Sequence, residues 1–160
     1  MTEIAVIDAG CDDIAGKITA GIRRYGGNPG DLLIAQVPSC AALSGSQPDI
    51  LVLGEDAAPS CGPAERIQCG ILLMPGDGDA SAFDARCIVT YGMSPKNTIT
   101  LSSISETSCV LAIQREFLTA GGDMLERQEI KIMGGMRPDC LLTVAGALLI
   151  LGLKISDTNG

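Results

Sequence analysis

Three carboxylates cluster near the amino end of the chain, in the run Ile7-Asp-Ala-Gly-Cys-Asp-Asp13. An apolar stretch precedes them and predicts a buried strand. Because ligands bind at the carboxyl ends of strands in open α/β sheets, and carboxylates suit Mg²⁺, this run is a candidate binding loop. The alternative is a helix N-cap, which acidic residues also favour. The candidate ligand-binding residues are Asp8, Gly10, Asp12 and Asp13, and the three acids are candidate Mg²⁺ ligands.

A second group of polar side chains follows another predicted strand, in the segment Tyr91-Gly-Met-Ser-Pro-Lys-Asn97. The Tyr91 hydroxyl, Ser94, Lys96 and Asn97 lie close together in sequence. Such groups could hold an anionic ligand. The alternative is a rigid connection between two parts of the sheet, in which proline fixes the turn and asparagine caps it.

A third candidate is Asp77, in the segment Met74-Pro-Gly-Asp-Gly-Asp79. Two acids and two glycines after a strand could close over a small ligand. They could equally form a plain surface turn, because Gly, Pro and Asp are the usual turn residues.

The composition excludes several classes of function. The chain has 160 residues with 11 basic and 19 acidic side chains, a formal net charge of −8 and no histidine. The excess of acidic residues argues against a nucleic-acid or anionic-membrane partner. The absence of histidine excludes Ser-His-Asp and Cys-His catalysis. Seven cysteines without a CxxC pair are expected to be buried thiols in a reducing cytoplasm. The amino end does not look like a signal peptide, and the apolar stretch 140–153 is shorter than the roughly 20 residues of a membrane span.

The pattern of apolar residues predicts a mostly parallel, open α/β sheet of Rossmann-like type, covered on both faces. Expected strands are 3–8, 32–37, 49–54, 70–74 and 86–90. A helix is expected after Asp13, since Ile14, Ile18 and Ile22 recur at helical spacing. A short acidic helix is expected near 79–84.

The pattern changes after Gly92. Extended runs at 98–104, 109–118 and 124–133, the last two separated by a turn at 120–123, predict an antiparallel three-stranded appendage. A nearly all-apolar helix is then expected to start at Pro138 and stop at Gly152, buried between layers or against a partner. The chain is thus expected to be one domain, 1–160, with a parallel core over 1–92 and the appendage plus helix over 93–153.

The carboxyl-terminal half resembles the end of the central domain of Mur ligases, the ATP-dependent enzymes that add amino acids to the peptidoglycan precursor. The resemblance covers about residues 70–153. It rests on Ile88-Val-Thr-Tyr-Gly92, which is similar to the family's "vxTyG" strand, and on Met74-Pro-Gly-Asp77 in the place of its "DD" turn. It also rests on the spacing from Gly134 to Gly152, which ends in Leu-Gly as the family's helix does.

The chain departs from the family at the nucleotide site. In the register of the family's phosphate loop, Asp12 stands where a lysine meets the phosphates, so the loop looks like a degenerate P-loop. Met136, Arg137 and Cys140 replace the His and two Asn of the family's G-x-H-N-x-x-N motif. The resemblance places Arg137 at a ligand-binding position, but it implies neither ligase activity nor a bound cofactor.

The leading hypothesis is a non-catalytic Mur-ligase-like domain that acts as a binding or interaction module in a bacterial cytoplasm, with a link to the cell wall. Its partner would be an unidentified protein or a small ligand. The alternative is a protein or enzyme that binds a nucleotide-like or anionic small molecule through the loops at the strand ends. A further alternative is a homodimer, formed through the apolar helix or the edge of the hairpin.

Overall fold

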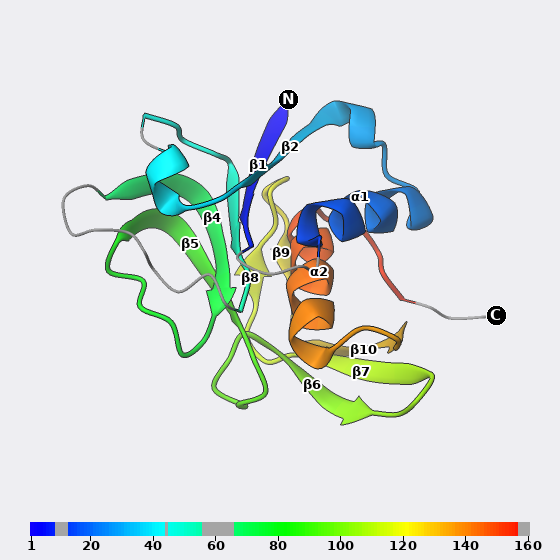
Figure 1. Ribbon diagram of the computed structural model, residues 1–160. Coiled ribbons are helices and arrows are strands. Elements are labelled where there is room, and N and C mark those ends of the chain that lie inside the picture. The colour runs from blue at the N-terminus through cyan, green and yellow to red at the C-terminus, as the bar shows by residue number, and fades with distance from the viewer. Residues whose placement is uncertain (9–12, 44, 56–65, 157–160) are drawn as a thin grey trace.

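The computed structural model describes residues 1–8, 13–43, 45–55 and 66–156. Within these residues the chain forms one eight-stranded sheet and a separate two-stranded sheet (Figure 1). The strands are β1 (Thr2–Ile7), β2 (Leu32–Val37), β3 (Ile50–Leu53), β4 (Ile67–Pro75), β5 (Phe83–Tyr91), β6 (Ile99–Ile104), β7 (Ser108–Ile113), β8 (Phe117–Leu118), β9 (Met124–Leu125) and β10 (Gln128–Met133). The helices are α1 (Ile14–Arg24) and α2 (Pro138–Ile150), and two short 3-10 turns are η1 (Pro29–Asp31) and η2 (Cys40–Leu43).

The large sheet is mostly parallel, and its strand order is β10-β7-β6-β5-β4-β3-β1-β2. The strands from β2 through β5 pair in parallel, and β6 joins β5 in parallel through Tyr91 and Ile99. All four residues of β3 are buried, as expected for a parallel strand covered on both faces. The predicted α/β class and mostly parallel sheet are confirmed.

The antiparallel strands extend the same sheet. Strand β6 pairs with β7 and β7 with β10, both antiparallel, so these strands continue the sheet beyond β5. The predicted turn at 120–123 is present, and it joins the separate pair β8 and β9. The two long runs that the sequence suggested are each broken in two, which places β7 and β10 in the large sheet and β8 and β9 outside it.

Helix α2 is the centre of the fold. Every residue from Cys140 to Ile150 is buried, because the helix packs on strands β3 to β6 and is covered in turn by α1. It starts at Pro138, and Gly152 ends it with a φ of 85° while its N–H donates to the Leu149 carbonyl. The predicted apolar helix is confirmed, and the layers that bury it belong to this same chain.

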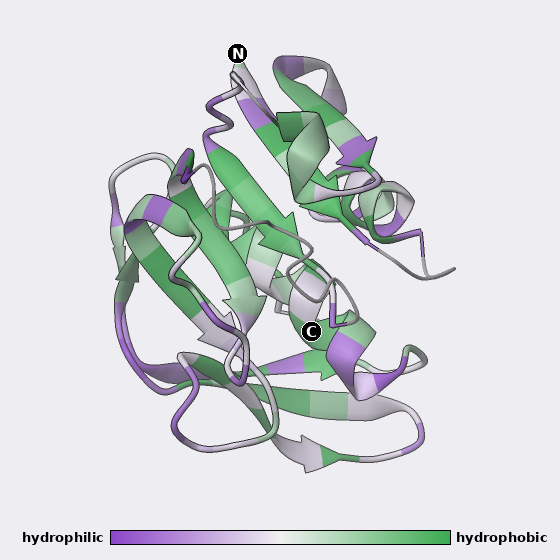
Figure 2. Ribbon diagram, turned by 60° about the vertical axis from the view of Figure 1, so that its left-hand side comes forward, coloured by the Kyte–Doolittle hydropathy of each residue, from purple (hydrophilic) through white to green (hydrophobic). Residues whose placement is uncertain are grey.

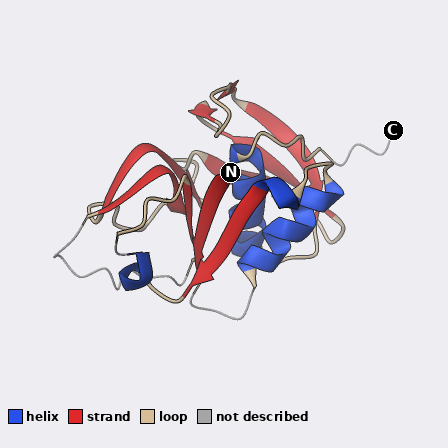
Figure 3. Cartoon of the chain, turned by 90° about the horizontal axis from the view of Figure 1, so that it is seen from above, coloured by secondary structure: helices blue, strands red, loops and turns tan. Residues whose placement is uncertain are grey.

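Helix α1 buries one face, formed by Ile14, Ile18 and Ile22, as the spacing predicts. Its close approach to α2 depends on Gly21, because a Cβ there would lie 2.6 Å from Leu148 Cδ1. Figure 3 shows both helices on one side of the parallel strands and η2 on the other.

The second face of the sheet differs from the prediction. In place of the acidic helix expected near 79–84, residues 76–82 form turns and extended chain, and β5 begins at Phe83. The reason is local: the Asp79 carboxylate accepts a 2.9 Å hydrogen bond from Ser81 N, which favours a turn over a helix. A smaller apolar cluster, to which Leu43 of η2 contributes, fills this face. Figure 2 shows the apolar residues running along the strands and α2.

The cysteines follow the prediction in part. Cys69, Cys87, Cys109 and Cys140 are free thiols, and three of them are buried. Cys40 is disulfide-bonded, so the expectation that all cysteines are thiols is wrong for this residue. Cys11 and Cys61 lie outside the described residues.

Neither α1 nor α2, the two α-helices of the described residues, has the length and apolar character needed to cross a bilayer.

Candidate ligand pocket at the carboxyl edge of the sheet

The strand order places a topological switch point between β1 and β3. The chain passes from β1 to β2 on one side and then returns to β3 on the other side. Ligands in open α/β sheets bind at such a switch point. The carboxyl ends are tightly joined here, since Gly54 N donates a 2.9 Å hydrogen bond to the Ile7 carbonyl.

A pocket of about 420 Å³ opens beside this point, at the carboxyl ends of β3, β4 and β5. Ligand sites typically measure roughly 300–1,000 Å³. Five of the residues predicted from the sequence line this pocket, so the structure brings together the loops after β4 and β5. The lining residues are Glu55, Gly76, Asp77, Tyr91, Gly92, Met93, Ser94, Lys96 and Asn97.

Asn97 is a fixed part of the pocket wall. Its Nδ2 donates a 3.1 Å hydrogen bond to the Ser94 carbonyl, and the side chain is only 6% exposed. A Cβ on Gly76 would overlap the Asn97 amide oxygen, and a Cβ on Gly92 would lie 2.7 Å from Nδ2. The two glycines therefore leave a slot that the asparagine fills.

The turn that carries Ser94 and Lys96 is held by its own hydrogen bonds. Asn97 N donates to the Ser94 carbonyl at 3.1 Å, and Lys96 N donates to Ser94 Oγ at 3.3 Å. The rigid connection considered from the sequence is therefore present, and the same turn lines the pocket. Rigidity and binding are compatible, because a preorganised wall lowers the entropy that a ligand must lose.

Tyr91 supports the pocket from below. Its side chain is fully buried, and its hydroxyl donates a 2.7 Å hydrogen bond to the Leu53 carbonyl. Burial raises the pKa of Tyr91 well above its ordinary value, and the negative charges of Glu55, Asp139 and Asp77 add to the effect. The sequence suggested that this hydroxyl meets a ligand, but in the structure it joins β5 to β3.

The pocket carries both signs of charge. Lys96 is the cation, while Glu55 and Asp77 are carboxylates. The hydroxyl of Ser94 and the backbone of Gly76 and Gly92 add neutral hydrogen-bonding groups. The arrangement suits a ligand with one anionic group and several hydroxyls, and it disfavours a bare triphosphate, which two carboxylates repel.

Asp8 and Asp13, the two described acids of the amino-terminal candidate group, bond to the start of α1. Asp13 Oδ1 accepts a 3.2 Å hydrogen bond from Gly16 N, which makes Asp13 the N-cap of α1. Asp8 Oδ2 accepts from Ile14 N at 3.4 Å, and Asp8 does not line the pocket. Gly10 and Asp12 lie outside the described residues. Across the described ranges, no three His, Cys, Asp or Glu side chains are grouped so that they could hold a metal ion.

Arg137 lies apart from the pocket. Its Nη2 is 3.3 Å from Asp139 Oδ2, and its side chain is more than half exposed at the start of α2. The resemblance placed this residue at a ligand-binding position, but it is not among the residues that line the pocket.

Sequence reasoning missed Glu55. Glu55 follows Gly54 directly after a fully buried strand, which is the same signal that identified Asp8. Gly76 belongs to the segment 74–79 that the sequence singled out, but its specific role was not predictable because it depends on the side chain of Asn97.

Comparison with known proteins assigns no family. No family model matches this chain, and no curated protein matches it.

Proposed function

We propose that the protein is a non-catalytic binding domain that holds a small polar molecule in the pocket at the carboxyl edge of the sheet. The observation that carries this proposal is the pocket itself, where Lys96 and Ser94 meet Glu55 and Asp77 on a preorganised wall. A filled, flat surface at these loops would have favoured a purely structural role.

The ligand class follows from the charges. One lysine provides for one anionic group, and the carboxylates accept hydrogen bonds from hydroxyls. A nucleoside monophosphate or a sugar phosphate has both features. Such a ligand needs no metal ion to offset repulsion, unlike a triphosphate.

The resemblance to Mur ligases remains part of the proposal. It is supported by the order of elements, in which a parallel core is followed by antiparallel strands and an apolar helix. The non-catalytic character is supported by the replacements at Asp12, Met136, Arg137 and Cys140. On this account the domain acts in a bacterial cytoplasm, in cell-wall metabolism.

An interaction with a second protein or a second copy is the other candidate. Strand β10 ends the large sheet, and an edge strand offers unpaired backbone groups to another chain. Met133 at the end of this strand is 52% exposed. The apolar helix offers no dimer face, because its residues are buried within the monomer.

Thermal unfolding with a panel of ligands tests the proposal. AMP, UMP and glucose 6-phosphate should stabilise the protein without Mg²⁺, while ATP, ADP, UDP-sugars and NAD serve as comparisons. A ligand at a hundred times its dissociation constant raises the free energy of unfolding by about 2.7 kcal/mol. Each kcal/mol raises the melting temperature of a domain of this size by roughly 2–4 °C. The K96Q variant should lose the shift, and K131Q, on the exposed part of β10, should keep it. Stabilisation by no monophosphate, or an equal shift in K96Q, would contradict the proposal.

A further inference from the structure

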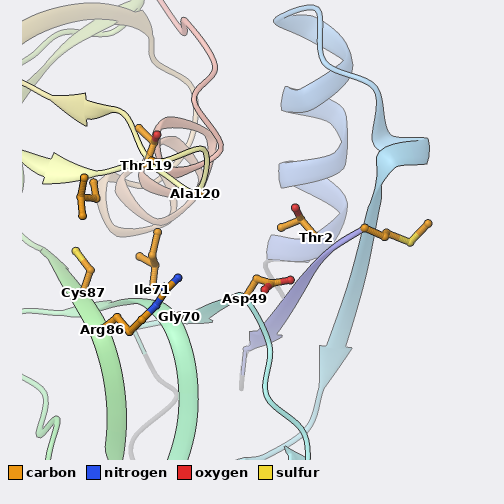
Figure 4. Close-up of a pocket in the computed structure, with 11 residues that line it drawn as sticks. Thr2, Asp49, Gly70, Ile71, Arg86, Cys87, Thr119 and Ala120 are labelled. Carbon is orange, nitrogen blue, oxygen red and sulfur yellow. The ribbon is translucent and has the colours of Figure 1, made fainter.

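A second pocket lies at the opposite edge of the sheet. It has a volume of about 450 Å³ and is formed by the amino ends of β1 and β3, the middle of β4 and β5, and the turn between β8 and β9 (Figure 4). Its lining residues are Met1, Thr2, Asp49, Gly70, Ile71, Arg86, Cys87, Leu118, Thr119, Ala120 and Gly122. The carboxyl-edge pocket shares none of them.

Arg86 brings a positive charge into this pocket. The residue stands on β5 beside Gly70 of β4, and its Nη2 would be 3.6 Å from a Cβ at Gly70 (Figure 4). In the part of the chain that the structure describes, the Arg86 guanidinium forms no hydrogen bond and no ion pair. A guanidinium is a planar donor suited to a carboxylate.

Asp49 brings a negative charge that is held in place. Its Oδ2 accepts a 2.8 Å hydrogen bond from Glu3 N, and its carbonyl accepts a 2.9 Å bond from Ile71 N. The residue is thus tied to β1 on one side and to β4 on the other. Although Asp49 and Arg86 line the same pocket, they form no ion pair with each other.

Gly70 keeps the space between the two charges open. A Cβ at this position would lie 2.6 Å from the Asp49 carbonyl oxygen, and it would occupy space next to the Arg86 guanidinium. An adjoining hollow of about 500 Å³ shares Asp49, Gly70 and Arg86, so the two charged groups face open space on both sides. Asp84 lines that hollow and adds a second carboxylate there.

The rest of the wall combines aliphatic side chains with the hydroxyl-bearing residues Thr2 and Thr119. Ile71, Leu118 and Ala120 border the pocket, and Leu118 is 44% exposed. Opposite charges that are apart from each other, beside aliphatic side chains, match a ligand that carries both charges on an aliphatic body. Such a ligand gives each charge a partner of opposite charge, which the described residues of the protein do not supply.

We infer that this pocket binds a small aliphatic zwitterion, whose carboxylate pairs with Arg86 and whose ammonium group pairs with Asp49. This inference is independent of the ligand proposed for the carboxyl-edge pocket.

The test uses zwitterions that differ in the separation of their charges: leucine, 4-aminobutyrate and 6-aminohexanoate. Each is titrated into the ¹⁵N-labelled full chain beside the matched acid that lacks the amine and the matched amine that lacks the acid. At least one zwitterion should bind saturably, about tenfold or more tighter than either of its halves, with shifts at Gly70, Ile71 and Ala120. The inference is overturned if no zwitterion binds saturably, or if none binds more tightly than its matched acid and its matched amine.

Variants assign the two ends of the ligand. R86Q should weaken the binding of the zwitterion and of the matched acid by about tenfold or more. D49N should weaken the binding of the zwitterion and of the matched amine, and it should leave the binding of the acid unchanged. R127Q, an exposed arginine outside both pockets, is the matched control. Unaltered binding in R86Q would contradict the inference. If a variant fails to fold, the affinities of the wild-type chain for the zwitterion, the matched acid and the matched amine still test the inference.

Discussion

The Tyr91 hydroxyl donates a 2.7 Å hydrogen bond to the Leu53 carbonyl, and this contact joins the last residue of β5 to the last residue of β3. Strand β4 lies between them, so the bond spans three neighbouring strands at the carboxyl edge of the sheet. The candidate pocket rests on these strand ends. Its shape therefore depends on a buried polar contact as well as on the loops.

Removing this hydroxyl should destabilise the protein. In Y91F the Leu53 carbonyl loses its side-chain donor in a buried environment, which typically costs about 1–3 kcal/mol. The urea midpoint of unfolding should fall accordingly, without a change in the slope. An unchanged midpoint would mean that water replaces the hydroxyl and that the bond does not support the strand ends.

The slot occupied by Asn97 should show strong coupling to Gly76. In G76A the new methyl group overlaps the asparagine amide, so the variant should be less stable and should bind ligand poorly. The double variant G76A/N97A should recover part of the stability that G76A loses, because the overlap is gone. G121A is the control, since a Cβ at Gly121 has no neighbour nearer than 3.9 Å. Strictly additive effects would contradict the packing described.

The N-cap of α1 combines two requirements at one residue. Asp13 has a φ of 48° and accepts a hydrogen bond from Gly16 N. D13N should be nearly neutral because asparagine tolerates this conformation and also caps, while D13G keeps the conformation but loses the cap. D13A loses both, and should be the least stable by about 1–2 kcal/mol. Equal stability of D13G and D13A would show that the conformation has no cost.

The pH dependence of stability should contain a contribution from Cys69. Burial, with a smaller effect of the Asp84 charge, raises the pKa of Cys69 from an ordinary 9.0 to about 11. The folded state therefore keeps its proton when the unfolded state has lost it. The stabilising contribution is complete below about pH 9 and is lost as the pH rises through about 11. Urea unfolding across this range should show a smaller decline in C69A than in the wild type, and equal declines would contradict this.

The buried position of α2 predicts a clear contrast between two apolar residues. Leu142 on α2 is fully buried, and Ile88 on β5 is 43% exposed. L142A should lower the free energy of unfolding by about 2–5 kcal/mol because it leaves a cavity. I88A should cost much less. Similar losses in the two variants would mean that α2 is not the centre of the core.

The sequence predicts the regular elements well for physical reasons. Apolar runs bounded by glycine or acid favour strands, which are fully buried in β3 and partly exposed in β2 at the edge of the sheet. The spacing of Ile14, Ile18 and Ile22 favours a helix. The all-apolar stretch after Pro138 likewise requires burial on every side.

The connections are less predictable, because they depend on single side-chain contacts. The segment 76–82 contains acids that cap helices elsewhere, yet Asp79 bonds to Ser81 N and forms a turn. The breaks that separate β7 from β8 and β9 from β10 fall at polar residues, 114–116 and 126–127. Polar residues also occur within β10, so polarity alone does not mark where a strand ends. The breaks place β8 and β9 outside the large sheet.

The candidate pocket was predictable where it depends on strand ends. Asp77, Ser94, Lys96 and Asn97 follow strands and do meet in space. The roles of Tyr91 and Asp13 depend on which backbone group each side chain reaches, namely the Leu53 carbonyl and Gly16 N. The presence of Asp49 and Arg86 in the same pocket depends on the strand order, which the sequence alone does not specify.

The most direct test of the proposed function is a titration of the ¹⁵N-labelled protein with AMP in the absence of Mg²⁺, followed residue by residue in the NMR spectrum. The account predicts saturable shifts at Glu55, Asp77 and the turn 92–97, the segments that line the carboxyl-edge pocket. The same titration of K96Q should show binding weakened by about tenfold or more, as expected when a charged partner of the phosphate is lost. Shifts that cluster elsewhere, or saturable binding that K96Q leaves unchanged, would contradict the assignment of this pocket as the ligand site.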